Sequence, residues 1–299
     1  MAGERSFARV AQIDAEALRA AVEDGGGPSL ELVERLVGGA VGAWLVRWPD
    51  GHLGVLTWAP PIPPGQPPGQ LDDVKALMEL ARAAGTPLPR YEAVFDVGEL
   101  GAAVLQERAF GQRPTTVSAE LVEQLIDLVE LRRGILAGSP FSGRPMPMYL
   151  ASSGPGWCLH EPLRAYSPRT AALVEEIEAL AGDNDSVAGD DLVHLDFHLD
   201  NILVDPDQPG KVTAVLDWDG ARAGLVGIDL AILAIDLTRR APSTLQHRVE
   251  SHLLATTPAD LVPRMWAHAG LRLVDWAIRH HGPEQVDHWV AITEEHLRR

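Results

Sequence analysis

The sequence is poor in cysteine and lysine, and it contains no long apolar run. Cys158 is the one cysteine among the 299 residues, which excludes an internal disulfide and any metal site built from several cysteines. The longest apolar stretch, Leu36 to Val46, is interrupted by glycines and is far shorter than the roughly 20 residues that cross a bilayer. The first residues lack the apolar run of a secretory signal. We therefore expect a protein of the reducing cytoplasm.

Positive charge is also scarce. The chain has 25 lysine and arginine residues against 42 aspartate and glutamate residues, so its formal net charge is −17. A field of this sign repels nucleic acid and anionic lipid, so we expect neither a nucleic-acid nor a membrane partner. The same field attracts a small cationic substrate, although acidity can also serve solubility alone. The sequence gives no indication of the oligomeric state.

The order of predicted elements changes near residue 110. Before it, short apolar runs predict strands at 30–37, 43–48 and 53–58 and two more within 90–105, with helices at 8–23 and 71–84. The proline-rich segment 60–69 is predicted to be a surface loop. After it, helical periodicity predicts helices at 118–136, 167–181, 228–239, 244–255, 259–281 and 284–298. A strand-rich part followed by a helical part indicates an α+β protein.

One segment between these helices is dense in aspartate and histidine. It begins at His194 and reads His-Leu-Asp-Phe-His-Leu-Asp-Asn, and two apolar runs separated by a Pro-Gly turn follow it. Paired as a hairpin, the two runs would bring Asp196, Asn201 and Asp217 to one end. Asn201 and Asp217 offer the oxygen ligands that suit Mg²⁺, and Asp196 can accept a proton from an attacking hydroxyl. This set indicates phosphoryl transfer, in which positioning and charge neutralisation supply most of the catalysis.

The segment resembles the catalytic loop of the aminoglycoside phosphotransferase and choline kinase-like family. That loop reads His-Gly-Asp followed by four residues and Asn, and a later strand of the family ends in a pair of carboxylates. The resemblance implies a protein kinase-like two-lobed α+β fold, with a small antiparallel-sheet N-lobe at 1–108 and a larger helical C-lobe at 109–299. The N-lobe would bind the nucleotide, and the C-lobe would carry catalysis and the substrate.

The resemblance also implies the roles of the loop residues. Asp196 would be the catalytic base, and His194 and His198 would brace the loop. Asn201 and Asp217 would hold Mg²⁺. Asp219 stands where the family often has a second acid, which can be a further metal ligand. Downstream, the stretch 224–231 resembles the family's Gly-Asp-Pro-x-x-Asp-Leu-Ala, with Asp229 as a buried structural acid.

ATP or GTP is the co-substrate that the resemblance implies. Gly39 lies in a glycine-rich turn between the first two strands, which an ordinary hairpin explains equally well. Thr57 belongs to the run that stands where the third strand of the family carries a phosphate-binding lysine. Glu107 and Ala109 resemble the hinge whose backbone groups bind adenine. We assign these four residues to the nucleotide site.

The chain departs from the family pattern at several positions. It has no lysine on the third strand and no glutamate partner near Val74, and Lys75 and Lys211 are its only lysines. Leu195 replaces the usual glycine of the catalytic loop, and Leu225-Val226 replaces Asp-Pro in the later stretch. None of these changes affects the metal ligands, but the missing lysine favours weak nucleotide binding or a phosphate contact from another residue, such as Lys75 or an arginine.

The expected acceptor is a cationic small molecule, and an antibiotic above all: an aminoglycoside, or a basic peptide of the capreomycin and viomycin type. Asp200 and Asp275 are candidates to bind its amines, although Asp275 also fits an ion pair within its own helix, between Arg272 and Arg279. Macrolide kinases and metabolite kinases for choline, homoserine or a ribose derivative are alternatives. A non-catalytic kinase-like ligand-binding protein is the alternative from another class.

Overall fold

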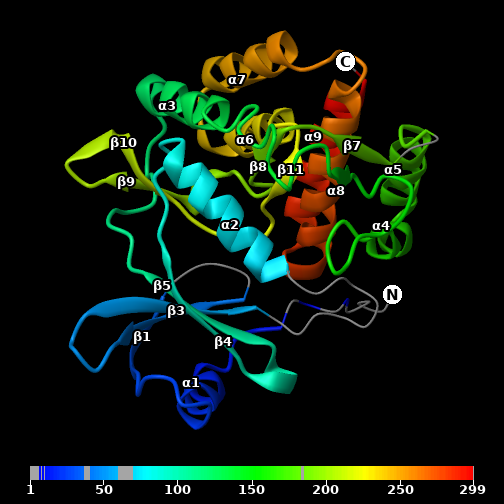
Figure 1. The fold of residues 1–299 in the computed structure, drawn as a ribbon. Coiled ribbons are helices and arrows are strands. Elements are labelled where there is room, and N and C mark those ends of the chain that lie inside the picture. Colours follow the sequence, from blue (N-terminus) through cyan, green and yellow to red (C-terminus); the bar gives the residue numbers. More distant parts are fainter. Residues whose placement is uncertain are drawn as a thin grey trace.

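The computed structural model describes residues 7, 9, 11–36, 41–59, 70–182 and 185–298. These residues form two lobes, a sheet lobe at the bottom of Figure 1 and a helical lobe above it. The predicted two-lobed α+β architecture is confirmed. Gly39 and the predicted loop 60–69 lie outside the described residues.

The sheet lobe is a five-stranded antiparallel sheet in the order β1-β2-β3-β5-β4. Its strands lie within two residues of the predicted ranges: β1 (Glu31–Leu36), β2 (Ala43–Arg47), β3 (Leu53–Ala59), β4 (Tyr91–Asp96) and β5 (Ala102–Glu107). A 3₁₀ turn, η1 (Gly98–Leu100), joins the last two strands. The sheet therefore ends at Glu107, and the lobe boundary at 108/109 stays a prediction.

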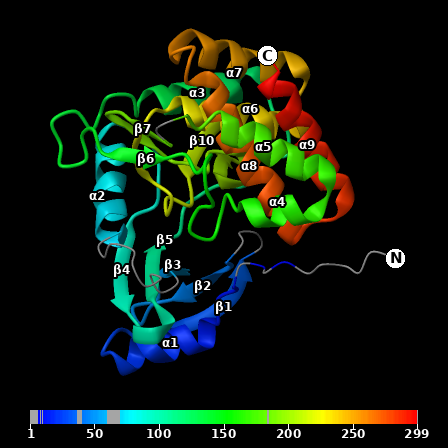
Figure 2. The same ribbon diagram turned by 90° about the vertical axis from the view of Figure 1, so that its right-hand side faces the viewer.

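Helix α1 (Ala15–Asp24) covers one face of this sheet, as Figure 2 shows. Its Leu18 and Val22 belong to the same buried cluster as Leu56 of β3 and Leu105 of β5. The helix begins later than predicted, because the Asp14 side chain accepts the N–H of Ala17 and caps its first turn.

Helix α2 (Gln70–Ala83) follows the sheet strands in sequence but packs on the helical lobe. Figures 1 and 2 show it standing against that lobe. Its apolar residues Val74, Leu77, Met78 and Ala81 belong to the core of the helical lobe. An ion pair of 2.8 Å between Asp73 and Arg144 also joins the two. The acids near Val74 thus serve the contact between α2 and the helical lobe.

The helical lobe contains seven of the described helices and three two-stranded sheets. The helices are α3 (Ala119–Glu130), α4 (His160–Tyr166), α5 (Pro168–Ala179), α6 (Gly227–Arg240), α7 (Ser243–Thr256), α8 (Val262–His280) and α9 (Pro283–Leu297). The paired strands are β6 (Pro145–Pro147) with β7 (Ser186–Ala188), β8 (Asp191–Val193) with β11 (Arg222–Gly224), and β9 (Ile202–Asp205) with β10 (Gln208–Val215). No helix in the described ranges combines the length and the apolar character that a membrane span requires.

In this lobe one helix prediction is wrong at its end, and one helix was not predicted. The helix predicted to reach residue 136 ends at Glu130, and turns follow it because Gly134 adopts a positive φ of 68°. Leu136 continues the helical spacing of apolar residues and is buried, but it lies outside the helix. Its N–H donates to the Asp190 carbonyl. Helix α4 was missed because its seven residues include a proline and are too few for a periodic signal.

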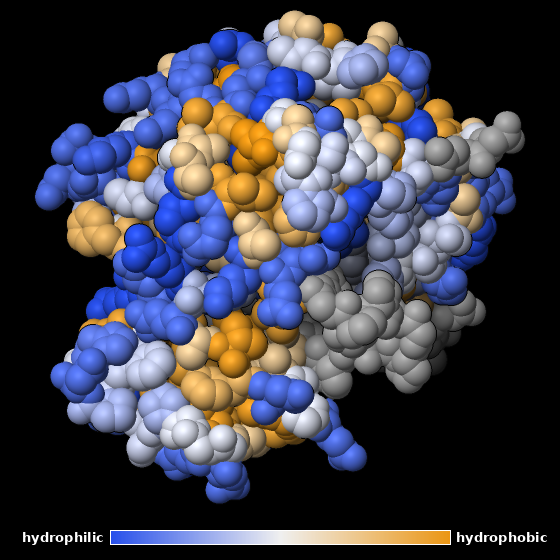
Figure 3. Space-filling model, in the orientation of Figure 1, coloured by the Kyte–Doolittle hydropathy of each residue, from blue (hydrophilic) through white to orange (hydrophobic). Residues whose placement is uncertain are grey.

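The outer surface of both lobes mixes apolar and polar residues. In Figure 3 apolar side chains gather over the middle of each lobe, and hydrophilic side chains occupy much of the left flank. The core of the helical lobe centres on α6, in which ten residues from Gly227 to Leu237 are buried. This apolar centre holds the segment that follows β8, where the sequence placed the catalytic loop.

Candidate active site

The predicted hairpin forms and gathers the acidic residues at one end. Ile202 of β9 pairs with Val215 of β10, and the Leu216 N–H donates to the Asn201 carbonyl over 2.8 Å. Asn201 therefore ends the 3₁₀ turn η2 (Leu199–Asn201) directly beside the residue that precedes Asp217. Asp196 lies close enough to Asp217 for their charges to repel. The structure thus brings Asp196, Asn201 and Asp217 together.

A buried carboxylate on α6 holds the start of the loop. Asp229 accepts the N–H groups of His194 and Leu195, each over 2.9 Å, and forms a fully buried ion pair of 2.6 Å with Arg132. Leu195 has a positive φ of 67°, a conformation that favours the glycine found here in the family. Its N–H bond to Asp229 helps to compensate this strain, so the loop keeps its path without the glycine.

His194 is a neutral brace inside the loop. Its side chain is fully buried, and its Nε2 donates to the Leu216 carbonyl over 2.8 Å. Its Nδ1 then accepts the N–H of Asp196 over 3.1 Å. Burial lowers the pKa of His194 to about 4, so the ring is uncharged at neutral pH. The histidine therefore ties Asp196 to the strand that leads to Asp217.

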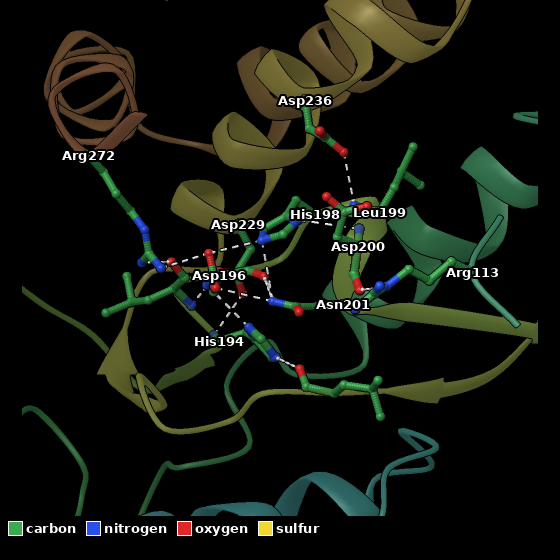
Figure 4. Close-up of polar contacts among 12 residues, drawn as sticks. Arg113, His194, Asp196, His198, Leu199, Asp200, Asn201, Asp229, Asp236 and Arg272 are labelled. Atoms are coloured by element: carbon green, nitrogen blue, oxygen red, sulfur yellow. Dashed lines mark hydrogen bonds and ion pairs between the residues drawn. The ribbon is translucent and has the colours of Figure 1, made fainter. Parts of the chain in front are cut away.

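The carboxylate of Asp196 has three side-chain partners, drawn in Figure 4. Its Oδ2 accepts from Asn201 Nδ2 over 3.1 Å, and its Oδ1 lies 2.7 Å from Arg272 Nη2 and 3.2 Å from His198 Nε2. Burial raises the pKa of Asp196, but the positive charge of Arg272 and the contact with His198 outweigh it and hold the pKa below its usual value. Asp196 is ionised and can accept a proton.

The other side of Asp196 carries the oxygen ligands. Asn201 directs its amide nitrogen at Asp196, so its Oδ1 is left for another donor or a cation. Loss of hydration, together with the neighbouring carboxylates of Asp219 and Asp196, raises the pKa of Asp217 to about 7. Asp219 accepts the Tyr91 hydroxyl of β4 over 3.0 Å. Repelling carboxylates beside an amide oxygen form the hard-oxygen donor set that Mg²⁺ prefers.

These donors fit Mg²⁺ in the manner of a kinase site. No cluster of three or more His, Cys, Asp or Glu side chains in the described ranges could hold a metal ion by itself. An ion bound through Asn201 and Asp217 would take its remaining oxygens from phosphate and water, as Mg²⁺ commonly does. The residues present therefore suit a nucleotide-bound ion better than a resident metal.

The sheet lobe presents a neutral pair where the family has its lysine. The Thr57 hydroxyl of β3 donates to the Val104 carbonyl over 3.4 Å and accepts from Gln106 Nε2 over 3.2 Å. The two lysines of the chain lie elsewhere. Lys75 is exposed on α2, and Lys211 lies 3.9 Å from Asp205 on the β9–β10 hairpin. Neither lysine lies on the five-stranded sheet.

The segment after β5 lies where the hinge was predicted. The Glu107 N–H donates to the Arg90 carbonyl over 2.8 Å, which joins the end of β5 to the residue before β4. Ala109 follows at the surface. Gly111 has a φ of 129°, and a Cβ there would lie 2.4 Å from Thr213 Oγ1, so only glycine fits the close approach to β10. This contact fixes the hinge against the β9–β10 hairpin.

The two predicted substrate acids are both neutralised. Asp200 accepts from both terminal nitrogens of Arg240, over 2.8 and 2.6 Å. Asp275 is 1% exposed and forms a two-pronged pair with Arg279 on the same helix. The ion-pair interpretation of Asp275 is therefore confirmed, and its burial does not suit a contact with substrate.

Sequence reasoning missed one residue that contacts Asp196. Arg272 of α8 was considered only as a helical partner of Asp275, yet it reaches across to Asp196 and also donates to the Leu195 carbonyl. Its guanidinium carbon lies 5.2 Å from the ring centre of Trp157. Nothing in the spacing of the sequence indicates this contact, because α8 is packed against the loop only in the folded chain.

Solved structures of aminoglycoside phosphotransferases share this fold. A thermostable mutant of aminoglycoside phosphotransferase APH(4)-Ia, in a ternary complex with AMP-PNP and hygromycin B, superposes with a TM-score of 0.62 at 16% identity, over 95% of this chain and 98% of that one. The enzyme APH(3'')-Id from Streptomyces rimosus, in complex with ADP and streptomycin, gives 0.51 at 16% identity, over 96% and 99%. A Thermobifida fusca protein assigned as a fructosamine-3-kinase gives 0.54 at 19% identity, over 94% and 98%.

Identities this low show the fold alone, and no curated protein matches the chain. The family is shown by a match along the sequence. The model of the phosphotransferase enzyme family (APH) matches residues 13–269, which include α1, the whole sheet and the catalytic loop. The chain with its His194–Asn201 loop is a member of the phosphotransferase enzyme family.

Proposed function

We propose that this phosphotransferase moves the γ-phosphoryl group of ATP or GTP, with Mg²⁺, to a hydroxyl group of a small molecule. The observation that carries the proposal is the position of Asp196, which lies between the amide of Asn201 and the guanidinium of Arg272. One neighbour is a candidate metal ligand, and the other belongs to the helix that bounds the acceptor side. The family match supports the reaction class.

In this mechanism Asp196 acts as the general base. The acceptor hydroxyl gives its proton to Asp196 while its oxygen forms a bond to the γ-phosphorus, and the bond from that phosphorus to the bridging oxygen breaks as the nucleoside diphosphate leaves. Asn201 and Asp217, with Asp219 as a further ligand, would hold Mg²⁺, which neutralises phosphate charge when bound. His194 and His198 keep the Asp196 carboxylate in place.

The nucleotide would lie between the lobes, with residues 1–108 as the nucleotide-binding lobe. We assign the adenine contacts to the backbone at Glu107 and Ala109, and Gly39 and Thr57 to the phosphate side. Two structures with the same fold are described with AMP-PNP or ADP, which supports a nucleotide co-substrate. Since β3 supplies no lysine, the phosphates would depend more heavily on Mg²⁺ than in a kinase that has one.

Two classes of acceptor are supported by different observations. The net charge of −17, together with the hygromycin B and streptomycin of the similar structures, supports a cationic antibiotic such as an aminoglycoside or a basic peptide. The neutralised carboxylates of Asp200 and Asp275 instead support a metabolite kinase. A ligand-binding protein without turnover is favoured only by the missing lysine.

A coupled assay of ADP or GDP release separates these functions. We expect release that depends on both acceptor and Mg²⁺ and that stops when the metal is removed with EDTA. Tight ligand binding without release, under either nucleotide, would support the binding protein instead. Release that continues unchanged in EDTA would contradict the assignment of Asn201 and Asp217 to the metal.

A further inference from the structure

Arg272, which contacts Asp196, belongs to a cluster of two arginines and a tryptophan. The guanidinium carbons of Arg272 on α8 and Arg222 on β11 lie 5.2 and 5.9 Å from the ring centre of Trp157. Arg272 also contacts the Asp196 carboxylate directly. Because Asn201 occupies the other side of Asp196, an acceptor that gives its proton to Asp196 approaches along these three side chains.

Arg222 carries a charge that no described residue neutralises. Its Nε donates to the Gly220 carbonyl over 3.0 Å, and it forms no ion pair with any carboxylate of residues 11–36, 41–59, 70–182 or 185–298. The buried Arg132 and Arg279, by contrast, each pair with an aspartate. Since a half-buried guanidinium without an anion is unfavourable, and the indole compensates it only in part, Arg222 is prepared for an anionic ligand.

Trp157 is held in a fixed orientation. Tyr149 meets its ring edge-on at 5.0 Å, and His268 does so at 5.5 Å. Both ends of the segment that carries it, Tyr149 and Cys158, adopt positive φ angles of 54° and 53°. Non-glycine residues are strained in this conformation, and such strain is concentrated at ligand-binding sites. The segment therefore places the indole beside the two guanidinium groups.

The two acids predicted to bind substrate amines are both held by arginines. On the loop, Asp200 is paired with Arg240, and on α8, Asp275 is paired with Arg279. The pair of arginines beside Trp157 is therefore a local feature that the overall charge of −17 does not reveal.

We propose that Trp157, Arg222 and Arg272 form the acceptor subsite and that the acceptor is an acidic hydroxy compound. Arg222 binds the carboxylate or phosphate group of the acceptor, Trp157 contacts its carbon skeleton, and Arg272 keeps Asp196 turned toward its hydroxyl. The inference rests on the proposed phosphotransferase function. The same proton passes to Asp196, and the same phosphorus–oxygen bonds form and break, as in that mechanism.

Matched pairs of acceptors test the charge preference. Glycerate is compared with glycerol, and ribose 5-phosphate with ribose, in the nucleotide-release assay, alongside choline, hygromycin B and streptomycin. We expect kcat/KM for at least one acidic member to exceed that of its neutral partner by about tenfold or more, the value of one charged contact. Equal or better turnover of the neutral or cationic compounds would overturn the proposal. The two pairs also distinguish a carboxylate from a phosphate.

Variants of Arg222 test whether this residue causes the preference for acidic acceptors. Arg222→Gln is expected to raise KM for the acidic acceptor about tenfold while KM for the nucleotide changes less than about twofold, and Arg222→Lys should recover part of the loss. Arg239→Gln is the matched control, because Arg239 lies 5.7 Å from the ring of Trp289 in the same kind of contact at another place. An effect of Arg222→Gln no larger than that of the control would contradict the subsite.

A binding measurement separates failure of this inference from failure of the function. Glycerate and ribose 5-phosphate are added to the whole protein, and the shift in Tm is compared between the wild type and Arg222→Gln. A shift lost in the variant supports the subsite even when no nucleotide is released with any acceptor, an outcome that would overturn only the function. Absence of both a shift and turnover with these acids would overturn the subsite.

Discussion

The two lobes differ in the charged groups that they offer for catalysis and for phosphate binding. In the helical lobe a buried aspartate, Asp229, and a neutral His194 hold the loop that carries Asp196. In the sheet lobe the run that stands where the family has its lysine contains Thr57, whose hydroxyl accepts from Gln106. By the proposed assignment, the chain keeps the groups for proton transfer and metal binding and lacks one phosphate contact. Catalysis and nucleotide affinity are therefore separable here, and each can be tested alone.

Replacement of the base should have the largest effect. Asp196→Asn removes the proton acceptor but keeps the shape of the side chain, so we expect turnover to fall by about 10³-fold, within the range of general base catalysis. Nucleotide release with saturating acceptor measures the change, and an unchanged Tm is the control for folding. Activity within a few-fold of the wild type would contradict the role of Asp196 and with it the helical lobe as the catalytic part.

Loss of the buried carboxylate should destabilise the helical lobe. Asp229→Ala leaves Arg132 buried without its partner and frees two loop N–H groups, so we expect the free energy of unfolding to fall by about 3–5 kcal/mol. Denaturant unfolding measures it. Glu123→Gln, which breaks the exposed pair with Arg248, should cost less than about 1 kcal/mol. Equal losses in the two variants would show that Asp229 does not hold the loop.

Acid should weaken the helical lobe through its buried neutral histidines. Burial lowers the pKa of His268 to about 4, against 6.5 for an ordinary histidine. Between these values the unfolded chain binds a proton that the folded chain refuses, so stability is complete above pH 6.5 and falls as the pH drops toward 4. The loss is at most roughly 3 kcal/mol for each such histidine.

His268→Asn tests this pH dependence. The amide can still donate to the Met148 carbonyl, which His268 Nδ1 contacts at 2.7 Å, but it does not titrate. We expect the unfolding free energy of the variant to fall less steeply between pH 6.5 and 4 than that of the wild type. Parallel pH profiles would contradict the assignment of the acid sensitivity to His268.

Addition of the missing lysine should strengthen nucleotide binding by the sheet lobe. Thr57→Lys places a positive charge at the position where the family binds phosphate, so we expect KM for ATP to fall by about tenfold, the worth of one charge-assisted hydrogen bond. Thr57→Val, which removes only the bond with Gln106, is the control. An unchanged or higher KM in Thr57→Lys would show that another group already fills this role.

Removal of the hydrogen bond between Tyr91 and Asp219, which joins the two lobes, should change activity the least. Burial and the charge of Asp219 raise the pKa of Tyr91, so its hydroxyl stays protonated and donates to that carboxylate. Tyr91→Phe removes this single bond, and we expect kcat/KM to change by less than about tenfold. A larger loss, at unchanged Tm, would mean that the two lobes are coupled through Asp219 rather than separable.

The parts of the site that a short stretch of sequence encodes could be predicted. Asp196, Asn201 and Asp217 are brought together by one hairpin, and the apolar runs and the turn of that hairpin are visible in the sequence. The strands of the sheet lobe were predicted closely for the same reason, because turn residues mark their ends. Helix α4 and the early end of α3 were not predicted, since a short helix has little periodicity and Leu136 continues an apolar pattern beyond its helix.

The sequence by itself determined the order of strands and helices, the family and the catalytic loop, because each is written in neighbouring residues and their hydrogen-bonding needs. Only the tertiary structure decided that Arg272 turns to Asp196 while Arg279 takes Asp275. Helical spacing allows either arginine to reach Asp275, and the packing of α8 against the loop made the choice. The same packing brings Trp157 and Arg222 together from distant parts of the chain, so the local charge of the acceptor side could not be read from the net charge.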